Sequence, residues 1–201
     1  MNPKHFGDTY DIVKQSLLRY LAPLGPWYAH PMFTGAFDVA QGKAFEALLG
    51  VSLVSTEVLT PRTDRGSYFS TARACPGHLF LDPDIGVWIK STRGKKAPAH
   101  LFAAELVEVA RRSPRLLTMV FDQALPRGGE ATSLGLKLEW LASAGLHGFA
   151  YQSHVSFILV GCCASVVGQA RGILESHGHL PQRRFVEGGN RTTPQSSGPL
   201  A

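Results

Sequence analysis

Short apolar runs alternate with helical segments of about a dozen residues over most of this 201-residue chain. Runs of this kind, bounded by turn residues, are typical of strands that are buried on both faces of a sheet. Strands that alternate with such helices predict right-handed crossovers and a mostly parallel sheet covered by helices on both sides. The sequence therefore predicts an α/β protein with a three-layer, Rossmann-like fold. Two runs that meet at His154 and Val155 without a linker predict a closing antiparallel strand pair or one bent strand.

Capping and turn residues set the expected bounds of the elements. Asp8 can cap the first helix, and Pro23 follows its end. We expect helices over residues 8–21, 37–49, 99–112, 131–144 and 164–177. We expect strands over residues 27–34, 51–59, 78–86, 116–123, 147–154 and 155–161. The fold prediction depends on this regular alternation.

The size and composition of the chain are typical of one globular domain. A chain of this length can bury a sufficient core without disulfides or metals, and 44% apolar with 17% charged residues is a globular composition. We expect a single α/β domain over residues 1–186 and a disordered tail over residues 187–201, which has little to bury. The sequence has neither an apolar stretch of about 18 residues nor a signal-peptide pattern, which predicts a cytoplasmic protein without a membrane partner.

Cysteine and charge patterns bear on chemistry and partners. The three cysteines lack the spacing of a disulfide framework or a zinc site, so we expect reduced, buried thiols.

The formal net charge is +5, and the basic residues gather in clusters that could neutralise phosphates. These clusters are Arg62/Arg65, Lys90/Arg93/Lys95/Lys96, Arg111/Arg112/Arg115 and Arg183/Arg184. They predict nucleic acid as a partner, with an ordinary solvated basic surface as the alternative.

The sharpest local signal is Asp82-Pro83-Asp84, at the carboxyl end of the most apolar strand. In an open parallel sheet, ligands bind beyond the carboxyl ends of the strands, where two acids could hold a metal or accept a proton. The same residues, followed by Gly86, are also good turn chemistry. The segment therefore predicts either a functional edge or a tight turn.

Further polar residues are expected near this edge of the sheet. Asp122 and Gln123 end the next strand, so Asp82 and Asp122 should share one edge if the two strands are neighbours. Tyr151 and His154 on the following strand could reach it too, although a histidine at a strand end is more often structural.

The first helix carries a second group of polar residues. Asp8, Asp11 and Lys14 recur every three residues and so share an approximate face, and His5 lies just before them. This spacing fits a binding face, and it also fits a solvated face with local ion pairs.

A family resemblance connects these two regions. The segment HFGDTYDIVK, from His5 to Lys14, resembles the amino-terminal histidine, glycine-asparagine and Ala-Asp-Val-Leu-Lys pattern of the bacterial large-subunit ribosomal RNA adenine-N6 methyltransferases. The Asp82-Pro83-Asp84 strand end resembles their Asp-Pro-Pro-Tyr catalytic element. The later strand, helix, strand, helix and hairpin order is similar to the second half of the class I methyltransferase fold. The resemblance implies S-adenosylmethionine binding near His5 and Lys14, with Glu57 as a partner for the ribose hydroxyls and Asp82 facing the target amine.

The sequence departs from this family pattern at two places. Asp84 and Ile85 replace the second proline and the aromatic residue that would stack on a flipped base. His30-Pro31-Met32-Phe33-Thr34-Gly35 stands where a glycine-rich cofactor loop would follow the first strand. The chain is also similar to uncharacterised bacterial proteins with an Asp-Pro-Asp-x-Gly strand end, a likeness that assigns no activity.

Three functions follow from the sequence, and the working hypothesis is a nucleic-acid-directed methyltransferase-like protein, active or degenerate, with Asp82, Asp84 and Asp122 as its catalytic candidates. The second is a metal-dependent nuclease or phosphodiesterase, in which the same acids bind Mg²⁺ and Lys90 stabilises the phosphoryl charge. The common nuclease signature has an acid two residues before this lysine, where this sequence has Trp88. The third is a non-catalytic module that binds nucleic acid or protein.

Overall fold

The computed structural model of the chain describes residues 3–36, 38–90 and 94–188. A seven-stranded sheet lies at its centre, in the order β2-β1-β3-β6-β8-β7-β9. The strands are β1 (Trp27–His30), β2 (Ser52–Leu53), β3 (His78–Leu81), β6 (Thr118–Asp122), β7 (His147–Gln152), β8 (Ser156–Gly161) and β9 (Phe185–Glu187). Neighbours from β2 to β6 are parallel, whereas β8 is antiparallel to both β6 and β7, and β9 is antiparallel to β7. The predicted mostly parallel α/β fold with a late antiparallel strand pair is confirmed.

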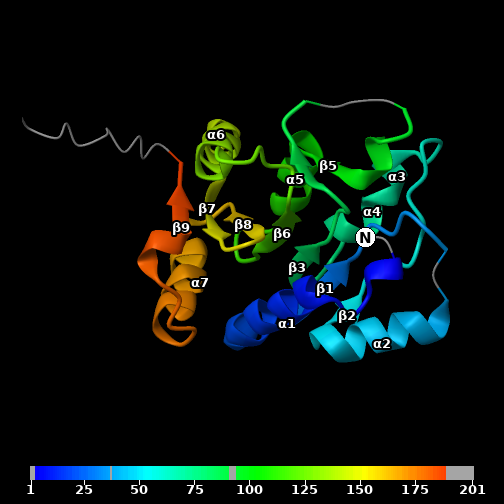
Figure 1. The fold of residues 1–201 in the computed structure, drawn as a ribbon, viewed down its shortest axis with the longest axis horizontal. Coiled ribbons are helices and arrows are strands. Elements are labelled where there is room, and N and C mark those ends of the chain that lie inside the picture. The colour runs from blue at the N-terminus through cyan, green and yellow to red at the C-terminus, as the bar shows by residue number, and fades with distance from the viewer. Residues whose placement is uncertain (1–2, 37, 91–93, 189–201) are drawn as a thin grey trace, which may run out of the picture.

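Helices cover both faces of this sheet. They are α1 (Thr9–Leu21), α2 (Val39–Leu49), α3 (Arg65–Tyr68), α4 (Ser70–Arg73), α5 (Ala103–Ala110), α6 (Glu130–Ser143) and α7 (Ala164–Ser176). One face packs its apolar side chains against α1, α2 and α7, and the other packs against α4, α5 and α6. Figure 1 shows α1, α2 and α7 along one side of the sheet and α5 and α6 along the other. The three expected layers are therefore present.

A small second sheet interrupts the expected order after β3. It consists of β4 (Gly86–Trp88) and β5 (His100–Phe102), which pair in parallel. The sequence predicted one strand over 78–86, but β3 ends at Leu81, just before Pro83. The helix predicted over 99–112 begins only at Ala103, because the three preceding residues form β5. The chain thus makes an excursion of about twenty residues before it returns to the main sheet.

Two other expected strands are shorter than predicted. The strand predicted over 27–34 ends at His30, because Pro31 has no N–H with which to continue the ladder. The strand predicted over 51–59 is only Ser52–Leu53, and the chain then runs as an irregular loop.

The remaining expectations concern the chain ends, the thiols and the membrane. Residues 189–201 of the expected tail lie outside the described residues, while Glu187 ends β9. All three cysteines are free thiols; Cys75 is buried, and Cys162 and Cys163 are half-buried. No helix in the described part of the chain is both long and apolar enough to cross a membrane.

Candidate functional site

A pocket of about 180 Å³ lies between the start of α1 and the carboxyl ends of β3 and β6. Four carboxylates line it, those of Asp8, Asp11, Asp82 and Asp84. Tyr10, Phe121 and Gln123 form much of its remaining wall, and the exposed His5 lies at its edge. The structure therefore brings the acidic strand end and the first helix together at one pocket.

Lys14 lies at the base of this pocket and joins the two elements. Its ammonium Nζ donates to Asp82 Oδ2 at 2.8 Å and to Asp11 Oδ1 at 2.9 Å. Asp11 and Lys14 face the same way because they are one helical turn apart. The other oxygen of Asp11, Oδ2, accepts the Gly7 N–H at 2.8 Å, which fixes the approach to α1. A chain of hydrogen bonds thus attaches α1 to the end of β3.

The three charged groups that form these hydrogen bonds are almost completely buried. Asp11, Lys14 and Asp82 are 1%, 4% and 1% exposed. Burial alone would lower the pKa of Lys14, but the charges of Asp82 and Asp11 and their hydrogen bonds outweigh it and raise that pKa. Burial raises the pKa of Asp82, and the charge of Lys14 opposes this only in part. Lys14 is therefore a firmly held cation, and Asp82 accepts a proton more readily than an ordinary aspartate.

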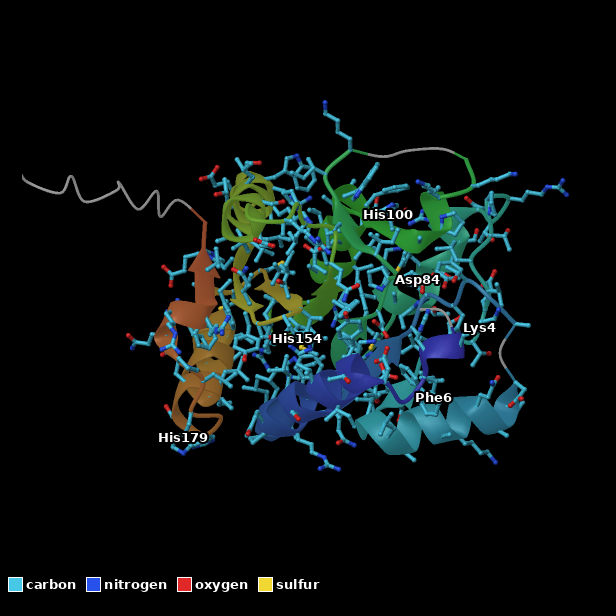
Figure 2. The ribbon with its side chains drawn as sticks, viewed as in Figure 1. Lys4, Phe6, Asp84, His100, His154 and His179 are labelled. Carbon is cyan, nitrogen blue, oxygen red and sulfur yellow. The ribbon has the colours of Figure 1, made fainter. Side chains whose placement is uncertain are left out.

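Asp84 occupies a more accessible position in the same pocket. Its side chain is half-buried, and its Oδ2 accepts a hydrogen bond from the Thr34 hydroxyl at 2.5 Å. A carboxylate oxygen is a hydrogen-bond acceptor, so Asp84 presents acceptor chemistry to the pocket that it lines. In Figure 2, Asp84 appears between His100 of the small sheet and the segment with Lys4 and Phe6 that precedes α1.

Asp122, the third acid expected at this edge, does not line the pocket. Its Oδ2 accepts from Lys137 Nζ of α6 at 2.7 Å, and its Oδ1 accepts from Val87 N and Ala124 N at 3.0 and 3.1 Å. Asp82 meets α1 and Asp122 meets α6, so the two side chains point to opposite faces of the sheet. The expected convergence of these acids is therefore not found, although their strands are neighbours.

Aromatic rings form one wall of the pocket, a feature that our sequence analysis missed. The ring of Tyr10 in α1 stacks on His154 in the turn after β7, with centroids 5.7 Å apart. It also contacts Phe121 of β6 at 5.9 Å, and Lys14 Nζ lies 4.6 Å above the Phe121 ring. Tyr151, the other candidate on β7, packs on Phe185 instead. The position of Tyr10 between Asp8 and Asp11 was the available signal.

The segment after β1 does not fit S-adenosylmethionine. Met32 and Phe33 are fully buried and belong to the cores on opposite faces of the sheet, so their side chains occupy the place where a cofactor loop would leave space. Glu57 is exposed in the loop after β2, and it does not line the pocket. A pocket of about 180 Å³ is also below the roughly 300–1,000 Å³ usual for ligand sites. His5 and Lys14 are therefore at the pocket, but the rest of the implied cofactor set is not.

His30, the last residue of β1, is part of this filled region. It is 0% exposed, and its ring packs against Tyr68 and Phe69 at 4.8 and 5.5 Å. Neither ring nitrogen has a well-formed hydrogen bond among the described residues. Burial lowers the pKa of His30 to about 4, and nearby backbone groups of Tyr68 and of His30 itself oppose this only slightly. The ring is therefore neutral in the folded protein at pH 7.

We expect the buried, neutral His30 to make the folded protein less stable in acid. Because the pKa of His30 is lower in the folded than in the unfolded chain, its contribution is present above pH 6.5 and is lost as the pH falls towards 4. The lowered pKa corresponds to about 3 kcal/mol. Urea unfolding at pH 8 and pH 4 should show that the wild type loses about this much more stability than His30→Leu. A matched change at the exposed His177 should leave the acid loss intact, and equal losses in wild type and His30→Leu would contradict the prediction.

One arginine in each of two basic clusters serves the structure itself. Arg65 forms two hydrogen bonds with Glu105, at 2.5 and 2.7 Å, and Arg112 donates to the carbonyls of Gly77, Val109 and Leu117. Lys90, Lys95 and Lys96 are exposed around the segment that joins β4 to β5. The predicted basic surface is thus narrower than the sequence indicates.

The arrangement defines an α/β protein with one acidic, aromatic-walled pocket at the carboxyl edge of its sheet. Within the described residues, no group of three or more histidine, cysteine or acidic side chains is placed to hold a metal ion. Compared with known proteins, the chain matches no family model, no curated protein and no solved structure.

Proposed function

We propose that this chain is a nucleic-acid-directed, methyltransferase-like protein of degenerate type, which binds an amine-bearing base in the pocket without transferring a methyl group to it. The observation that carries the proposal is the pocket, which is lined both by the polar side chains of Asp84 and Gln123 and by the rings of Tyr10 and Phe121. Adenine and cytosine are planar rings that carry an exocyclic amine. Enzymes that act on bases bind such rings by stacking and by hydrogen bonds to the polar edge.

The pocket chemistry favours a base over a phosphate. Four carboxylates and the Lys14 ammonium line the pocket, so a phosphate would be repelled there while an amine donor would be attracted. The volume of about 180 Å³ suits a single ring system rather than a whole nucleotide. Tyr10 supplies an aromatic surface from α1, whereas Ile85 stands at the aromatic position of the Asp-Pro-Pro-Tyr element. The basic side chains that suit phosphates lie outside the pocket.

The order of strands and helices supports the proposal of a methyltransferase-like scaffold. From β3 to β8 the chain follows the strand, helix, strand, helix and hairpin order for which the resemblance was noted, with the small sheet added after β3. The filled segment at Met32 and Phe33 argues against use of S-adenosylmethionine. A scaffold that keeps the base pocket but not the cofactor loop is suited to recognition. The function proposed is therefore binding of nucleic acid.

Titration with nucleosides tests the pocket. Adenosine and cytidine should shift the NMR signals of Tyr10 and Gln123, and inosine and uridine, which carry an oxygen in place of the amine, should bind at least several-fold more weakly. Tyr10→Ala should weaken adenosine binding by about 5- to 150-fold, because stacking on an aromatic ring contributes about 1–3 kcal/mol per base. Asp84→Asn should weaken it by about 10-fold through loss of a charged acceptor.

Tyr20→Ala is the matched control, because Tyr20 lies on the same helix and is 36% exposed like Tyr10. Equal binding of all four nucleosides, or no binding of any, would refute the proposal. S-adenosylmethionine is the further comparison, for which we expect no binding. Stoichiometric binding that weakens in His5→Ala would instead favour the active methyltransferase.

A further inference from the structure

The excursion between β3 and α5 exposes a tryptophan in an unusual way. Trp88, the last residue of β4, is 42% exposed, whereas Trp27 is 6% exposed and Trp140 is half-buried. Its ring lies against the buried His100 of β5, with centroids 4.3 Å apart and planes 30° from parallel. This contact supports the ring from one side. Trp88 is therefore an exposed aromatic surface held by the small sheet rather than a freely rotating side chain.

The charged residues of the segment that carries Trp88 all have one sign. The sequence from Ile85 to Phe102 contains three lysines, one arginine and no acid. The lysines, which are Lys90, Lys95 and Lys96, are exposed. Ile85 and Ile89 in the same segment are also 36% and 37% exposed. This excursion thus combines an aromatic platform with positive charge, whereas the neighbouring pocket is acidic.

The position of this surface relates it to the pocket. Trp88 follows Asp84 by four residues, which places it at most about 14 Å further along the chain. β4 also contacts β6 directly, since Gln123 N donates to Ile85 O at 2.8 Å and Asp122 Oδ1 accepts from Val87 N. The exposed surface is therefore fixed relative to the pocket by hydrogen bonds to the main sheet.

We propose that Trp88, with Lys90, Lys95 and Lys96, is a second contact for single-stranded nucleic acid, on which a neighbouring base stacks while the pocket holds another. The inference rests on the proposed function and names its substrate class. Exposed aromatic rings beside basic side chains are the means by which proteins bind single strands without reading their sequence. Protein interfaces are depleted in lysine, so three lysines without an acid fit a phosphate chain better than a protein partner. A base stacked in a duplex would not offer its face to Trp88.

Binding of a labelled eight-nucleotide single strand, measured by fluorescence anisotropy, tests this surface. Trp88→Ala should weaken binding about 10-fold, while Trp88→Phe should retain most of it. Lys90→Gln, Lys95→Gln and Lys96→Gln together should lower the slope of log affinity against log salt by about 2, since each phosphate contact contributes about 0.7. Lys43→Gln, on the exposed side of α2, is the matched control and should change little. The intrinsic fluorescence of the wild type should be quenched by the strand, and that of Trp88→Phe should not.

Adenosine binding separates the two proposals, because it uses the pocket alone. We expect it to be unchanged in Trp88→Ala and in the triple lysine variant. If the strand binds these variants as well as it binds the wild type while Tyr10→Ala weakens it, the second contact is overturned and the pocket function stands. If neither adenosine nor the strand binds the wild type, both proposals fail. Binding to anionic phosphatidylserine vesicles that requires Trp88, without any effect of Trp88 on the strand, would assign the surface to a membrane instead and overturn the inference.

Discussion

Replacement of Lys14 by methionine is expected to lower the free energy of unfolding by about 3–5 kcal/mol, because it leaves Asp11 and Asp82 as buried charges without their cation. Both acids bond to the same ammonium group, at 2.9 and 2.8 Å. Methionine has a similar length and can fill the same space, so the loss should reflect charge rather than packing. Urea denaturation monitored by circular dichroism at pH 7 measures it. Lys43→Met, at an exposed position on α2, should change stability by less than about 0.5 kcal/mol.

The cost of Lys14→Met should depend on pH in a defined direction. Burial raises the pKa of Asp82, and loss of the lysine removes a charge that opposes this rise. A raised folded-state pKa contributes stability that is fully present below the unfolded pKa of about 3.9 and is lost as the pH rises through the folded value. The variant should therefore recover stability relative to the wild type in acid, where Asp82 is neutral. A cost that is the same at pH 7 and pH 4 would show that Asp82 is not the group responsible.

The common face of Asp11 and Lys14 and the place of Asp82 at the sheet edge could be expected from local rules. The three-residue spacing of Asp11 and Lys14 determines their common face on a helix. Asp82 follows a run that is apolar at every position, which is typical of a strand buried on both sides. Parallel strands end at one edge of the sheet, so the acid had to lie at that edge. Only the contact between the two elements needed the structure.

The separation of Asp82 from Asp122 could not be read from the sequence in the same way. Successive side chains in a strand point to opposite faces, so a shift of one residue in register reverses the face of every side chain. In the structure Leu81 pairs with Val120, and both pack in the core on the α5 and α6 face. The acids that follow them are one and two residues further on, and they point to opposite faces. No local pattern specifies that register.

The aromatic wall and the small sheet depend on contacts between distant parts of the chain. Tyr10 and His154 are far apart in sequence, and nothing local brings the turn after β7 to the first turn of α1. The sequence predicts a helix over the three residues of β5, because their apolar character fits either element. They become a strand through pairing with β4, which the structure anchors to β6.

Asp122 accepts one of the hydrogen bonds that anchor β4 to the main sheet, and its replacement should have two effects. Asp122→Leu removes the partner of the buried Lys137 and the acceptor of the Val87 and Ala124 N–H groups. We expect a loss of about 3–5 kcal/mol in the free energy of unfolding, because the ammonium of Lys137 in α6, which is 5% exposed, keeps its bond to the Ala124 carbonyl but loses its counter-charge. We also expect the fluorescence of Trp88 to change, since β4 loses a hydrogen bond to the main sheet.

A second substitution, at Lys137, separates the loss of the counter-charge from the loss of the hydrogen bond to β4. Asp122→Leu with Lys137→Met replaces the ion pair by apolar side chains, and such replacements of buried pairs are often neutral or stabilising. The double variant should therefore recover much of the lost stability in urea denaturation. The Val87 N–H still lacks its acceptor, so β4 should remain loosened, and acrylamide should quench Trp88 more in the double variant than in the wild type. If stability returned together with wild-type quenching, Asp122 would only neutralise Lys137. The position of the exposed tryptophan would then depend on the pairing of β4 with β5 and on the hydrogen bond from Gln123 N to Ile85 O.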